Sequence, residues 1–77
     1  MKLKNKKIME HLTYYVIVYN SIVESIDNEV EFLQYGTLEE MLSFLDECKK
    51  EYFAMGYFAS IRTIQNGEEI DRQLISI

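Results

Sequence analysis

The feature that most constrains this chain is a single amphipathic helix with clear end signals, predicted between Gly36 and Gly56. Thr37 is a suitable N-cap, and Glu40 stands three residues later, as in a capping box. Gly56 stands where a helix ends in the left-handed conformation. One apolar stripe follows helical spacing: Leu38, Met41, Leu42, Leu45, Cys48, Tyr52 and Phe53. The helix therefore has one face to bury, and the rest of the chain must supply the surface that buries it.

The stretches on either side of the helix predict β-strands. Residues 13–19, TYYVIVY, place β-branched and aromatic side chains on both alternating faces, which suits a central strand covered on both sides, or covered by a partner on one of them. Towards the C-terminus, the dipeptide Asn66-Gly67 predicts a hairpin, because both residues tolerate the positive φ angles of a two-residue turn. With such a turn, Arg62 faces Asp71 across the hairpin and forms an opposite-charge pair.

The segment between the first strand and the helix allows two interpretations. Residues 30–35, VEFLQY, predict a second strand that follows a turn at Asp27-Asn28. In that register Glu24 lies opposite Glu31, and this like-charge pair disfavours the arrangement. A helix through the same segment is the alternative, because its apolar residues also follow helical spacing. The β-branched content and the turn signal favour strand, turn and strand.

Together these elements predict a small α+β domain with the order β-β-α-β-β, in residues 12–77, behind a basic tail in residues 1–11. One amphipathic helix packs on one face of a mainly antiparallel sheet, since a helix of ~27 Å matches strands of ~26 Å. One helix covers only one face, so the other face is expected to expose aromatic side chains and form an interface. The residues predicted for this aromatic interface are Tyr15, Tyr19, Tyr35, Tyr57 and Phe58.

The distribution of charge argues against direct nucleic-acid binding by the folded part. Residues 8–77 hold four basic and thirteen acidic side chains, a net charge of −9. Proteins that bind nucleic acids usually show the opposite balance, because Lys and Arg neutralise the phosphates. We expect instead an acidic surface that binds a protein partner, made of Glu24, Asp27, Glu29, Glu31, Asp46 and Glu47.

The sequence offers few groups for chemistry. One histidine, His11, and one cysteine, Cys48, do not supply the ligands of a typical zinc site, and DNEVE lacks the ligand spacing of a calcium loop. We therefore expect no catalytic residue, no metal, no cofactor and no enzyme activity. A lone cysteine forms no internal disulfide and no apolar run is long enough to span a bilayer, which together predict a cytoplasmic protein.

The sequence thus predicts a non-catalytic interaction protein that forms a homodimer. Our leading hypothesis is a small acidic module that occludes the basic surface of a nucleic-acid-handling protein. In size, acidity and composition, though in no motif, the chain resembles phage-encoded inhibitors of nucleases, repair enzymes and CRISPR effectors. Two alternatives stay open: a homodimeric assembly protein whose aromatic sheet face is buried against its copy, and a small-ligand sponge with a Tyr-lined pocket.

Overall fold

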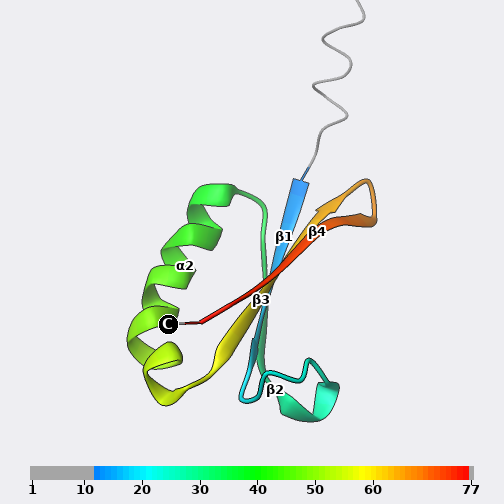
Figure 1. The fold of residues 1–77 in the computed structure, drawn as a ribbon. Coiled ribbons are helices and arrows are strands. Elements are labelled where there is room, and N and C mark those ends of the chain that lie inside the picture. Colours follow the sequence, from blue (N-terminus) through cyan, green and yellow to red (C-terminus); the bar gives the residue numbers. More distant parts are fainter. Residues whose placement is uncertain (1–11, 77) are drawn as a thin grey trace, which may run out of the picture.

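The computed structural model describes residues 12–76 and has the predicted α+β architecture (Figure 1). The sheet has the order β2-β1-β3-β4, and all three of its pairings are antiparallel. The elements follow in the order β1 (Leu12–Tyr19), η1 (Ile26–Asn28), β2 (Glu29–Tyr35), α2 (Leu38–Glu51), η2 (Phe53–Met55), β3 (Phe58–Gln65) and β4 (Glu68–Ile75), where η1 and η2 are single 3-10 turns. The predicted basic tail and His11 lie outside the described residues.

Helix α2 has the predicted caps but is shorter than its sequence signals suggest. The Thr37 hydroxyl accepts a hydrogen bond from the Glu40 backbone N–H at 3.2 Å, and Gly56 adopts a φ angle of 88°. The α-helix ends at Glu51, however, and the chain then tightens into the 3-10 turn η2. This turn brings Phe53 into the core, where the residue is 4% exposed.

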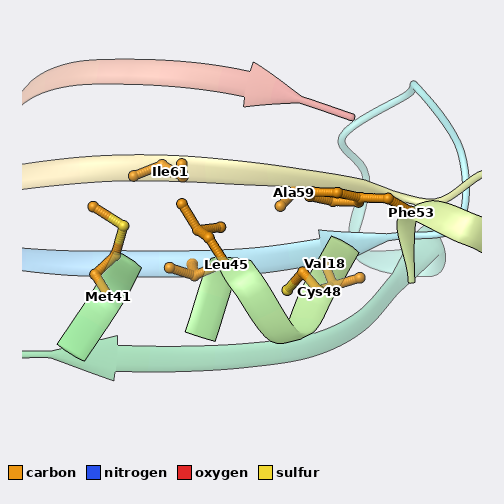
Figure 2. Packing of buried hydrophobic residues seen from close by; sticks show 8 residues of the cluster. Val18, Met41, Leu45, Cys48, Phe53, Ala59 and Ile61 are labelled. Carbon is orange, nitrogen blue, oxygen red and sulfur yellow. The ribbon is translucent and has the colours of Figure 1, made fainter. Parts of the chain in front are cut away.

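The core lies between α2 and one face of the sheet (Figure 2). Alternate residues of the two central strands point towards the helix, as the pattern of β1 predicted. Phe44 packs on Tyr35 of β2, so this flank of the helix faces β2, whereas Leu38 and Leu42 lie on the opposite flank and are each 49% exposed. The buried cluster consists of Val16, Val18, Met41, Leu45, Cys48, Phe53, Ala59 and Ile61.

The hairpin of β3 and β4 has the predicted turn and a different register. Asn66 and Gly67 have φ angles of 53° and 82°, as a two-residue turn requires. An irregularity beside Thr63 and Ile64 then leaves Ile70 as an extra residue in β4, and the pairing shifts by one position. The predicted pair of Arg62 with Asp71 is therefore wrong.

The prediction for the β1–β2 connection was right about the second strand and wrong about its partner. Phe32 pairs with Ile17 and Glu31 pairs with Val18, both in β1, so Glu24 does not lie opposite Glu31. The residues after Tyr19 form an irregular connection that ends in η1, on the side of the sheet away from α2 (Figure 1). The alternative of a helix through this segment is also wrong.

Candidate interaction surface

The carboxylates predicted as one partner-binding surface are distributed over several parts of the molecule. Glu24 lies on the sheet face away from the helix, within ion-pair distance of two arginines of the sheet. Asp46 pairs with Lys49 on α2, with 3.7 Å between the charged atoms. Asp27 is exposed in η1, and Glu29, at the start of β2, lies opposite Tyr19. Of the predicted set, Glu31 and Glu47 share a neighbourhood, because both lie near enough to Cys48 and Tyr35 to raise the pKa of these groups.

Glu31 and Glu47 belong to a group of four side chains that we call the carboxylate flank: Glu31, Glu40, Glu47 and Glu51. The three on α2 are spaced by seven and four residues, so they lie along one side of the helix. Phe44 lies on the same side, and its ring centroid is 5.8 Å from that of Tyr35 in β2, which shows that this side of the helix faces β2. Glu31 points from β2 towards the helix, where it accepts a hydrogen bond of 2.5 Å from the Tyr52 hydroxyl.

Three titratable groups beside the carboxylate flank have raised pKa values, to which the charges of the flank contribute after burial or a hydrogen bond. Burial raises the pKa of the Cys48 thiol to about 11, with smaller contributions from the charges of Glu31, Glu51 and Glu47. The hydrogen bond to Glu31 raises the pKa of Tyr52 to about 12. The pKa of Tyr35 is raised, mainly by burial and then by Cys48 and carboxylates of the flank. No Lys or Arg within residues 12–76 forms an ion pair with these four carboxylates.

The two arginines of the sheet form ion pairs with carboxylates outside the carboxylate flank. We call this group the arginine cluster: Arg62, Arg72, Glu24 and Glu69. The shifted hairpin register places Arg62 directly opposite Arg72. Glu24 lies between these like charges, 3.2 Å from Arg62 and 3.7 Å from Arg72. Glu69 accepts two further hydrogen bonds from Arg72, at 2.8 and 2.9 Å. Both arginines are therefore neutralised inside the molecule.

The arginine cluster also closes part of the sheet face that was predicted to be an aromatic interface. Arg62 donates a hydrogen bond to the Tyr19 hydroxyl at 3.1 Å, and Glu24 holds the connection after β1 against this end of the face. Ile17, Tyr19 and Ser60, which point away from the helix, are at most 3% exposed. The face is thus partly covered by the chain itself.

The five aromatic residues predicted for that interface do not form one surface. Tyr35 packs against Phe44 on the helix side, and Tyr57 stacks on Tyr52 with 6.1 Å between the ring centroids. Tyr19 is buried, which leaves Tyr15 and Phe58, both half-buried, among the five predicted residues.

The most exposed apolar side chains are mostly aliphatic and were not among the residues predicted for the interface. Ile26 is 78% exposed and Ile22 is 64% exposed, because the chain leaves the sheet after Tyr19. Phe32 is 49% exposed although its ring lies 5.3 Å from that of Tyr15. We call this set the apolar segment: Ile22, Val23, Ile26, Val30 and Phe32. Glu40 and Glu51 were also absent from the predicted surface, although their spacing from Glu47, seven and four residues, places all three on one side of a helix.

Other kinds of site are not found in the described part of the chain. Residues 12–76 contain no enclosed pocket and no group of three or more residues that could hold a metal ion. In the same range, no helix has the length and apolar character needed to cross a membrane. Comparison with models of protein families, with curated proteins and with solved structures finds no match to this chain.

Proposed function

We propose that this protein is a non-catalytic acidic module that binds a basic surface of another protein. The observation that carries this proposal is the uncompensated charge beside β2. Residues 12–76 hold twelve acidic and four basic side chains, and Arg62 and Arg72 are already paired with Glu24 and Glu69. The charges of the carboxylate flank are therefore not compensated by any Lys or Arg of residues 12–76, and they remain available to a partner.

A surface of this kind favours association with a basic protein. Unpaired carboxylates attract a positively charged surface over a distance of about one Debye length, ~8 Å at physiological salt, and speed up encounter. Proteins that handle nucleic acids carry such surfaces because they neutralise phosphates with Lys and Arg. In its most specific form, the proposal is that the module occupies such a surface and excludes the nucleic acid.

The proposal is tested by capture of partners from lysate with two variants of equal charge. The triple variant Glu40→Gln, Glu47→Gln and Glu51→Gln neutralises the helix side of the carboxylate flank. The control variant Asp46→Asn, Glu68→Gln and Asp71→Asn removes the same charge from exposed positions elsewhere. We expect the flank variant alone to lose the partner, and the captured partner to lose its nucleic acid when the wild-type protein is added. Capture that is equal for both variants and unchanged by salt would contradict the proposal.

The apolar segment specifically favours a second candidate, the homodimer. Ile22, Ile26 and Phe32 expose apolar surface that association of two copies would remove from water. Sedimentation across a salt series separates the two candidates. Added salt screens like-charge repulsion and strengthens a homodimer of acidic chains, whereas it weakens the binding of a basic partner. A monomer at all salt concentrations would exclude the homodimer.

A further inference from the structure

We propose that the basic partner binds by adding an extended segment to the outer edge of β2, as a fifth strand of the sheet. The segment carries Lys or Arg at alternate positions, with apolar residues between them. This proposal rests on the proposed function, because it specifies how the basic partner is held. It follows from the free edge of β2 and from the different chemistry on the two sides of that strand.

Of the two edges of the sheet, β2 is the one suited to accept another strand. No strand within residues 12–76 pairs with the outer edge of β2, so its backbone N–H and C=O groups are available to a partner. Strand β4 forms the other edge and carries four charged side chains together with the extra residue Ile70. Charges and bulges of this kind disfavour edge-to-edge pairing. Strand β2 also has an irregularity, at Val30 near its start, but from Glu31 to Tyr35 it pairs regularly with β1 and presents a continuous edge.

The side of β2 that faces the helix selects basic residues. Glu31 points to this side, and the carboxylates of Glu40, Glu47 and Glu51 line the neighbouring side of α2. Side chains of an added strand that point to this side lie beside these carboxylates. Because alternate residues of a strand point to the same side, the carboxylates select cations at every second position.

The opposite side of β2 selects apolar residues. Phe32 is 49% exposed and contacts Tyr15, and Val30 is 43% exposed. The intervening residues of an added strand point to this side and cover these two side chains. An alternating basic and apolar segment therefore matches both sides of β2 at once.

Charge argues against a second copy of the chain as the occupant of this edge. Antiparallel pairing of β2 with its own copy keeps both helices on the same side of the extended sheet. The two carboxylate flanks then face each other across the new pairing, and like charges at such positions repel. A basic segment meets the same carboxylates with opposite charge.

The proposal is tested with synthetic peptides and the full chain. The probe is a peptide of alternating lysine and valine with the length of β2, and its control has the same composition with the lysines in one block. We expect the alternating peptide to bind at least about tenfold more tightly than the block peptide. We also expect it to slow amide hydrogen exchange in β2 and to bind about tenfold more weakly to the flank variant than to the equal-charge control variant.

Three outcomes would overturn the proposal. Equal binding of the two peptides without protection of β2 amides would exclude strand addition, while the proposed acidic binding function would stand. Absence of binding by either peptide, both to the wild type and to a variant without the four tail lysines, would exclude this edge as a basic docking site, and the capture experiment would decide the proposed function separately. Binding only to a variant in which Lys2, Lys4, Lys6 and Lys7 are all changed to Gln would show that the chain's own basic tail occupies the edge.

Discussion

The arginine cluster gives the sharpest prediction on stability. Glu24→Gln keeps the size of the side chain and an acceptor oxygen but removes the charge between Arg62 and Arg72. The side chains of Glu24 and Arg62 are only 23% and 20% exposed, so water screens their ion pair incompletely. Hydrogen bonds to charged groups contribute about 1 kcal/mol more than neutral ones, and an unmasked like-charge pair across two strands costs up to about 1 kcal/mol.

We therefore expect Glu24→Gln to lower the free energy of unfolding by about 2 kcal/mol, a large part of the roughly 5–10 kcal/mol of a domain this small. The melting temperature should fall by about 8–16 °C. Urea unfolding followed by circular dichroism measures the loss. Asp46→Asn is the matched control, because Asp46 and Lys49 are 76% and 65% exposed and such pairs contribute at most about 1 kcal/mol.

A double variant tests the reason for the loss. If Glu24 stabilises the fold by separating two like charges, then Arg72→Gln should cost less in the Glu24→Gln background than in the wild type, because it also removes the repulsion. A Glu24→Gln variant as stable as Asp46→Asn, or costs of Glu24→Gln and Arg72→Gln that simply add, would refute the reasoning.

Three further predictions concern single residues. Stability should fall as pH rises from the ordinary tyrosine pKa of 10.0 towards about 12, because folded Tyr52 retains a proton that the unfolded chain loses. Tyr52→Phe should flatten this part of the plot of unfolding free energy against pH. A plot that the substitution leaves unchanged would disprove the role of Tyr52. Cys48 should react slowly with a disulfide reagent at pH 8, because its thiol is buried and its pKa is raised to about 11; rapid reaction in the folded state would contradict this. Gly56→Ala should lower the free energy of unfolding in urea by about 1–2 kcal/mol, because φ is 88° at this position. Gly36→Ala should be nearly neutral, because Gly36 has open space around it and no positive φ. Equal losses of stability in the two variants would exclude backbone strain as the cause.

The parts of the fold that could be predicted depend on residues near one another in the sequence. The cap of α2 joins Thr37 to Glu40, three positions away, and the hairpin turn depends only on Asn66 and Gly67. The two faces of β1 follow from strict alternation within a single strand. Such signals are complete in the local sequence, so element order and fold class could be predicted from it.

The candidate site could be predicted only in part, because its residues meet through tertiary packing. Glu31 and Tyr52 are 21 positions apart, and they come together only when Phe44 packs on Tyr35 and fixes α2 beside β2. The spacing of Glu40, Glu47 and Glu51 indicates one side of a helix, yet it does not indicate which strand that side faces. The predicted acidic surface therefore combined side chains that the fold places on different parts of the molecule.

One extra residue in β4 accounts for the wrong prediction of the Arg62 partner. Because Ile70 is unpaired, Arg62 meets Arg72 instead of Asp71, and two guanidinium groups then need a shared carboxylate. Glu24 provides it from 38 positions before Arg62 in the sequence, and this contact holds the connection after β1 against the sheet. The same cluster covers Tyr19 and pairs both arginines with carboxylates, while the Arg72 side chain stays 46% exposed. The local sequence of residues 24–31 gives no signal of this contact, because its partners lie in β3 and β4.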